Sequence, residues 1–159
     1  MRPAESESQR LELSEAASTL LDECRMVLPG VQAIFGFQLI AVFQQKFGED
    51  LDRGYQCLHL AALVLVAISA AMIMTPAAYH RLQGAHHVTE RFLRVSSRLL
   101  LIALAPLATG LSVDVFLLGK LILDNDATAA MIATALFGAM VFMWYAFPHI
   151  ARVREFSAN

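Results

Sequence analysis

The sequence predicts an all-α fold: an integral membrane four-helix bundle with an N-terminal amphipathic helix. Hydrophobic residues make up 57% of the 159 residues and charged residues only 16%, whereas soluble domains carry ~25% charged residues. The apolar residues also gather in four runs, each long enough or nearly so to cross ~30 Å of hydrocarbon. Because an unpaired backbone group is costly in lipid and the runs do not alternate, each run is expected to be a helix.

The N-terminal segment, residues 1–28, is expected to lie in the cytoplasm. Residues 1–9 are polar and predicted to be disordered. Residues 10–28 predict an amphipathic helix, because one face is acidic and the other carries Leu13, Ala17, Leu20, Cys24 and Val27 at helical spacing. This helix either lies on the membrane or the bundle, or joins two subunits through a heptad seam. Pro29 and Gly30 then predict a kink.

The membrane domain is predicted over residues 29–150, with spans at about 27–43, 57–74, 99–123 and 127–147. Gln44 and Gln45 are expected to extend the first span, and Pro106 is expected to kink the third. The loop 79–97 is the longest, with a turn signal at 83–85 and a short helix around 88–97. Residues 151–159 form a cytoplasmic tail.

The distribution of basic residues predicts the orientation of these spans. Of the 12 Lys and Arg residues, all but Lys46, Arg53 and Lys120 fall on the side that holds both termini and the loop 79–97. Basic residues favour the cytoplasmic side. We therefore expect a multi-pass protein of the cell inner (plasma) membrane with both termini in the cytoplasm.

Three polar residues stand at similar depths in the outer part of the predicted spans. Asp114 lies inside the third span, His59 two residues into the second and Gln38 in the first. A carboxylate inside a membrane costs ~2.5–3.5 kcal/mol on insertion scales and usually faces a cavity or a partner. The three are therefore expected to meet, either as a proton relay or as an ordinary hydrogen-bonded helix contact. Gln32 lies on another face of the first span and is the predicted inner part of an ion pathway.

A second polar group is predicted at the cytoplasmic rim. It serves either as a solvated anchor or as a pH-sensing or anion-binding site, and comprises Glu23, Arg25, His80, Arg81 and His149. His86 and His87 are adjacent, so they point about 100° apart on a helix and do not predict a metal site. In the fourth span, Ala130, Thr134 and Gly138 form a small-residue ridge that predicts close contact with another span or subunit.

Several classes of protein are disfavoured. The formal net charge of −2 argues against nucleic-acid binding. Cys24 and Cys57 fit no metal spacing and are expected on opposite sides of the membrane. We recognise no catalytic or nucleotide-binding motif, and therefore expect no enzyme activity and no cofactor. The acidic N-terminus lacks the pattern of a cleavable signal peptide.

Four segments carry a family resemblance: Glu23-Cys24-Arg25, the stretch 30–39, the phenylalanine-rich stretch 43–47 and the stretch 76–81. Together they resemble an uncharacterised bacterial family of small four-span membrane proteins, a domain of unknown function loosely associated with sodium/proton antiport. The resemblance implies that Gln32, Gln38, His80 and Arg81 belong to the family pattern, without assigning them roles.

The sequence is compatible with two functions. The first is a homo-oligomer that conducts or transports protons or monovalent cations across the lipid bilayer, because four spans leave little room inside one subunit. The second is a non-transporting accessory or signalling protein, which binds a partner through its N-terminal helix or its cytoplasmic rim.

Overall fold

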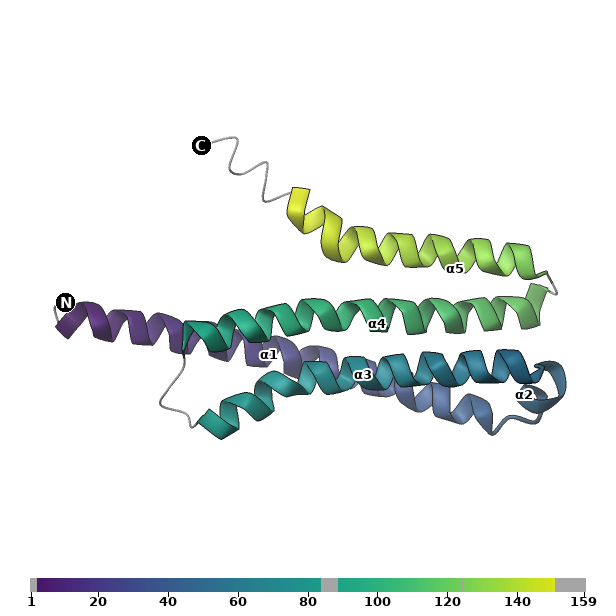
Figure 1. The fold of residues 1–159 in the computed structure, drawn as a ribbon, viewed down its shortest axis with the longest axis horizontal. Coiled ribbons are helices and arrows are strands. Elements are labelled where there is room, and N and C mark those ends of the chain that lie inside the picture. The colour runs from purple at the N-terminus through teal and green to yellow at the C-terminus, as the bar shows by residue number, and fades with distance from the viewer. Residues whose placement is uncertain (1–2, 84–88, 124, 151–159) are drawn as a thin grey trace.

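The computed structural model describes residues 3–83, 89–123 and 125–150 (Figure 1). Every regular element in these ranges is helical, which confirms the all-α class. The elements are α1 (Pro3–Val42), α2 (Gln45–Asp50), α3 (Arg53–Gln83), α4 (Glu90–Leu123) and α5 (Asp126–Val141), which continues into the π-helical segment η1 (Phe142–Ala146).

Four of these helices are long and apolar enough to cross a membrane: Leu11–Val42, Arg53–Leu82, Glu90–Leu123 and Asp126–Ile150. Large apolar side chains cover their outer surfaces, such as Phe37 at 71% exposure and Ile122 at 70%. Contiguous apolar surface on this scale is uncommon on soluble monomers. These features indicate a multi-pass membrane protein.

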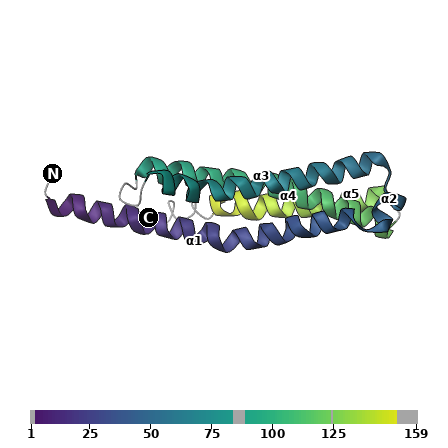
Figure 2. The ribbon, with the colours of Figure 1, turned by 90° about the horizontal axis from the view of Figure 1, so that it is seen from below.

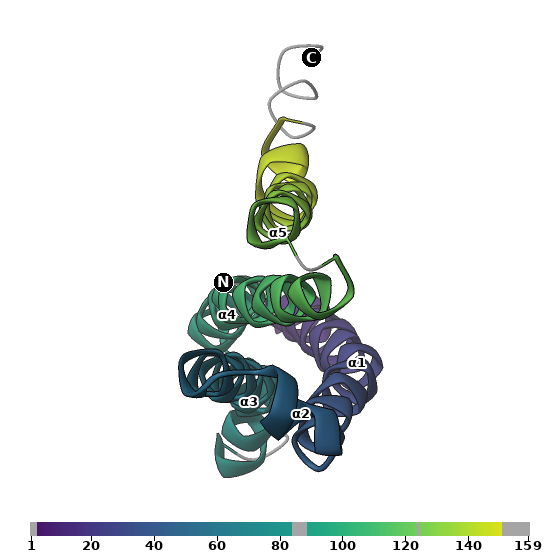
Figure 3. The same cartoon turned by 90° about the vertical axis from the view of Figure 1, so that its right-hand side faces the viewer.

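The helices pack as a core of three with a fourth at its side. α3 packs along α4 most extensively, and α1 lies against α3 and more sparsely against α4. The end-on view in Figure 3 shows α5 standing outside this group, against α4. α1 begins at the same end of the bundle at which η1 lies, and α2 is at the opposite end (Figure 1).

Small residues allow α3 and α4 to approach each other closely. A Cβ atom added to Gly110 of α4 would lie 2.9 Å from Val66 Cγ2 and 3.0 Å from the carbonyl oxygen of Ala62. Nearby, the Ser69 hydroxyl donates a hydrogen bond of 2.8 Å to the carbonyl oxygen of Ala103. Close backbone approach and hydrogen bonds between helices are the main sources of helix association in lipid.

α5 contacts α4 most closely through residues next to the predicted ridge, which was expected to meet another span or subunit. Its buried residues are Ala129 and Ala133, and Ala129 lies so close to Gly119 that a Cβ there would be 3.1 Å from the Ala129 Cβ. The predicted ridge of Ala130, Thr134 and Gly138 is exposed. Ala130 and Thr134 nevertheless line a cavity between α5 and α4, together with α4 residues such as Val113 and Phe116.

α1 differs from the sequence prediction because it continues through Pro29 as one helix from Pro3 to Val42. It therefore crosses the expected boundary at residue 28, and residues 3–9 are helical rather than disordered. Pro29 removes only one backbone hydrogen bond, and buried side chains on both sides of it pack in the core cluster: Leu20, Cys24 and Val31. Figure 2 shows the first turns of α1 extending past the other helices.

The helix ends differ in smaller ways from the predicted limits. The first helix ends at Val42, so Gln44 and Gln45 do not extend it, and Gln45 begins α2 instead. α3 continues to Gln83 and α4 begins at Glu90, which shortens the predicted loop. Pro106 lies inside an α4 that runs nearly straight in Figure 1. The predicted turn at 84–85, the start of the short helix at residue 88, His86, His87 and the tail 151–159 lie outside the described residues.

We expect Gly110→Ala to destabilise the bundle. Alanine favours a helix by about 1 kcal/mol over glycine, but overpacking at the contact with Ala62 and Val66 costs about 1–3 kcal/mol. Thermal unfolding in detergent measures the balance. Gly138→Ala is the matched control, because a Cβ there meets no atom within 4 Å, and it should leave the melting temperature unchanged or raise it. Equal melting temperatures for the two variants would contradict the close packing of α3 on α4.

Candidate functional site

Gln38, His59 and Asp114 form one hydrogen-bonded group that we call the polar cluster. The Gln38 side-chain amide donates to Asp114 Oδ2. His59 Nδ1 lies 3.1 Å from Asp114 Oδ1, and His59 Nε2 lies 3.0 Å from the backbone carbonyl oxygen of Gln38. The cluster therefore joins α1, α3 and α4 at one point, and the three residues meet as their similar depths predict.

The cluster is largely buried at the α2 end of the bundle. Gln38 is 5% exposed and His59 is 7% exposed, whereas the Asp114 side chain is 23% exposed. The Phe47 ring of α2 packs edge-on against the imidazole of His59, with ring centroids 5.1 Å apart. Because isolated charges are costly in a low-dielectric environment, the hydrogen bonds within this group decide its protonation state.

Local capping directs the chain from α2 into α3 and so places His59. Asp52 Oδ1 accepts hydrogen bonds from the backbone N–H groups of Gly54 and Tyr55, at 2.8 and 3.2 Å. A carboxylate in this position satisfies the free donors at the start of a helix. The Gln56 side chain donates to the Leu51 carbonyl oxygen at 2.8 Å, which ties the connecting segment to the first turns of α3.

The partners of His59 determine how many protons the cluster holds. A backbone carbonyl only accepts hydrogen bonds. Nε2 therefore carries a proton, and this N–H donates a hydrogen bond to the carbonyl oxygen of Gln38. A hydrogen bond between Nδ1 and Asp114 Oδ1 requires a second proton, on the imidazole or on the carboxyl group. Both arrangements leave the pair neutral overall. The Asp114–His59 pair thus holds one proton more than a neutral histidine beside a bare carboxylate.

A cavity of about 320 Å³ lies beside the cluster, between α1 and α4 and beneath α2. Its polar lining consists of Gln38, His59 and Asp114, and its remaining lining is apolar: Ile34, Phe37, Ala41, Phe47, Leu51, Leu117, Leu118 and Leu121. Among the described residues, His59 and Asp114 are the titratable side chains that line it.

One atom of the cluster has no hydrogen-bond partner. Gln38 Oε1 is buried and accepts no hydrogen bond. Leaving a buried acceptor unsatisfied costs about 1–3 kcal/mol, so such an atom is a sign of a second state or of a ligand. Rotation of the amide by half a turn exchanges Oε1 with Nε2, which lets Gln38 accept a hydrogen bond from a protonated Asp114 Oδ2 instead of donating one to it.

The other predicted site residues lie away from the polar cluster. Gln32 is exposed on α1. A second cavity of about 400 Å³, toward the other end of the bundle, is lined by Arg25, His80 and Arg81 together with apolar residues of α1 and α3. Glu23 lines a neighbouring cavity, and His149 is exposed. Arg25 also pairs with the exposed Asp22 at 3.1 Å.

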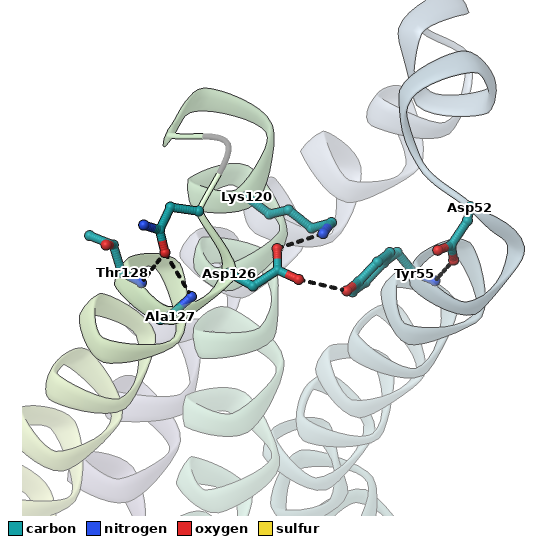
Figure 4. A network of polar contacts seen from close by, with 7 residues as sticks. Asp52, Tyr55, Lys120, Asp126, Ala127 and Thr128 are labelled. Atoms are coloured by element: carbon teal, nitrogen blue, oxygen red, sulfur yellow. Dashed lines mark hydrogen bonds and ion pairs between the residues drawn. The ribbon is translucent and has the colours of Figure 1, made fainter.

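A polar network at the α2 end was not predicted from the sequence. Lys120 Nζ lies 2.5 Å from Asp126 Oδ1 and 4.3 Å from the centre of the Tyr55 ring, and the Tyr55 hydroxyl donates to Asp126 Oδ2 at 3.2 Å (Figure 4). Asn125 caps α5 by accepting from Ala127 and Thr128. The network joins α3, α4 and α5. The polar residues near 120–128 are its only sequence signal.

The described residues contain no group of three or more His, Cys, Asp and Glu side chains arranged to hold a metal ion. Cys24 is buried in the core near Leu20, and Cys57 is exposed on α3; both are free. The fold and the site thus define a class: a multi-pass helical membrane protein with a partly buried carboxylate–imidazole pair beside an apolar cavity.

The chain belongs to the family of unknown function DUF6328, whose profile matches residues 4–148. This match supports the resemblance to an uncharacterised family. It does not test bacterial origin or an association with antiport, which stay predictions. No curated protein and no solved structure matches the chain.

We expect Gln38→Leu to destabilise the protein, because Asp114 Oδ2 loses its donor inside the bundle. The loss of a partner to a buried polar group costs about 1–3 kcal/mol. Thermal unfolding in detergent should show a lowered melting temperature. Gln32→Leu is the control on the same helix, and its exposed position predicts little change. The polar cluster would lose its structural importance if both variants melted like the wild type.

Proposed function

We propose that this protein is a proton-coupled transport protein of the membrane, in which the polar cluster binds and releases the proton. The observation that carries the proposal is the pair of acceptors around His59, which requires an extra proton on the Asp114–His59 pair. A largely buried titratable pair beside a cavity is a common feature of proton-binding sites in membrane proteins.

Loss of the proton changes the contact between helices. Without it, the lone pairs of His59 Nδ1 and Asp114 Oδ1 face each other at 3.1 Å, and their repulsion favours separation of α3 from α4 at this level. This separation also affects Gln38 of α1. Its side-chain amide contacts Asp114, and its backbone carbonyl oxygen contacts His59. Proton binding thus supplies a difference in free energy between two arrangements of three helices, which is what coupling requires.

The wider setting is part of the same proposal. We place the protein in the inner (plasma) membrane with its termini in the cytoplasm, so that the polar cluster lies near the outer face and the cavity of Arg25, His80 and Arg81 near the inner face. We further propose a homo-oligomer. Three core helices and a flanking α5 enclose little interior, and α5 offers an exposed face that includes Ala130, Thr134 and Gly138.

One observation favours a second candidate function. The first turns of α1 extend beyond the other helices (Figure 2), which is a suitable place for a partner protein to bind. In this alternative the protein is an accessory or signalling component that transports nothing, and the polar cluster only holds α1, α3 and α4 together.

Proton flux into liposomes separates the two functions. With purified protein and an imposed pH gradient or membrane potential, we expect wild-type flux above that of empty liposomes. Asp114→Asn should reduce it at least tenfold, because an amide cannot bind and release the proton. Asp22→Asn serves as the control, since Asp22 is exposed and lies on α1 outside the cluster.

The absence of wild-type flux under every gradient would favour the accessory function. Equal flux in the wild type and Asp114→Asn would show that any proton path avoids the polar cluster. A pH-dye signal inside the liposomes provides the measurement, and a melting curve shows whether each variant is folded.

A further inference from the structure

We propose that the cavity beside Asp114 binds an apolar organic ammonium ion. This inference rests on the proposed function and deepens it, because the ion takes the place of the proton at the same carboxylate. Asp114, Gln38 and the apolar wall of the cavity are the features that select this class of ligand.

The cavity is reached from the side of the bundle that would face lipid. Phe37 of α1 and Leu118 of α4 both line it, and they are 71% and 57% exposed. α1 packs against α4 more sparsely than against α3. The cavity is therefore open between α1 and α4. A ligand that enters here needs an apolar body that partitions into the lipid, which a fully hydrated inorganic ion lacks.

Inorganic cations fit the cavity poorly. A dehydrated metal ion needs several oxygen ligands to replace its water shell. The polar side chains of the lining are Gln38, His59 and Asp114, of which Asp114 alone is a carboxylate, and the apolar lining side chains supply no oxygen ligand. An ammonium group on an apolar body needs fewer partners, because its carbon atoms are stabilised by contact with the walls.

The polar end of the cavity provides complementary partners for such a group. The Asp114 carboxylate lines the cavity, where it accepts from an ammonium N–H and neutralises its charge. The aromatic rings of Phe37 and Phe47 also line the cavity, and aromatic faces attract cations.

The exchange balances in charge and in protons. Before binding, Asp114 and His59 share one proton and are neutral together. When the ammonium ion binds, that proton leaves to water, and Asp114 remains as a carboxylate paired with the ligand. His59 stays neutral, and its Nε2–H donates a hydrogen bond to the carbonyl oxygen of Gln38. One proton is therefore released for each ammonium ion bound.

Binding to protein in lipid nanodiscs tests the inference with two probes of nearly equal shape. 2-Phenylethylammonium carries the charge, and 2-phenylethanol replaces the ammonium group with a hydroxyl. After subtraction of empty nanodiscs, we expect saturable binding of the ammonium probe, at least tenfold tighter than the alcohol. Binding should release close to one proton and strengthen as the pH rises.

Two variants locate the binding site. Asp114→Asn should weaken the ammonium probe at least tenfold, while Asp22→Asn should bind it like the wild type. Leu118→Trp adds bulk to the wall of the cavity at a partly exposed position, and should weaken binding even if Asp114→Asn proves unstable. Equal binding of the two probes, or undiminished binding by folded Asp114→Asn or Leu118→Trp, would overturn the inference.

The outcome separates this inference from the proposed function. A protein that passes protons through an Asp114-dependent path but binds no ammonium probe refutes the inference alone. Binding of the ammonium probe without proton release contradicts both the exchange described here and the proposed proton site. Displacement of the probe by millimolar sodium ions would show that the site selects an inorganic cation instead.

Discussion

The two ring nitrogens of His59 face a backbone carbonyl oxygen and a carboxylate oxygen, and neither of these groups donates a hydrogen bond in its ordinary state. The extra proton that this arrangement requires is the interaction on which the site depends. It keeps the Asp114–His59 pair neutral inside an apolar bundle, where an uncompensated charge is costly. It also bridges α3 and α4, and Gln38 extends the same contact to α1. The position of three helices is therefore linked to one proton.

The surrounding fold makes this link possible. The close approach of α3 and α4 at Gly110 and the hydrogen bond from Ser69 to Ala103 hold these helices together below the cluster. Above it, Lys120, Asp126 and Tyr55 join α3, α4 and α5. The polar cluster lies between these two sets of contacts. It is next to the sparse contact of α1 with α4 and to the cavity there. A change of protonation would therefore act beside the sparsest contact among the three core helices.

Much of this arrangement could be predicted from the sequence, and the reasons are physical. The four helices follow from the length of the apolar runs. The contact among Gln38, His59 and Asp114 follows from their similar depths, because polar residues inside a membrane form hydrogen bonds with one another. Helix rotation could not be predicted in the same way: α5 contacts α4 through Ala129 and Ala133, one position away from the ridge that the spacing favoured. Continuity through Pro29 depends on core packing on both sides of it, and the network of Tyr55 and Asp126 joins residues far apart in the chain.

Nitrogen NMR of ¹⁵N-histidine-labelled protein in bilayers tests the shared proton most directly. The account predicts that His59 Nε2 carries a proton, and that Nδ1 has a shift characteristic of a strong hydrogen bond, which Asp114→Asn changes. An unprotonated Nε2, or an Nδ1 resonance that is the same in the wild type and Asp114→Asn, would contradict it.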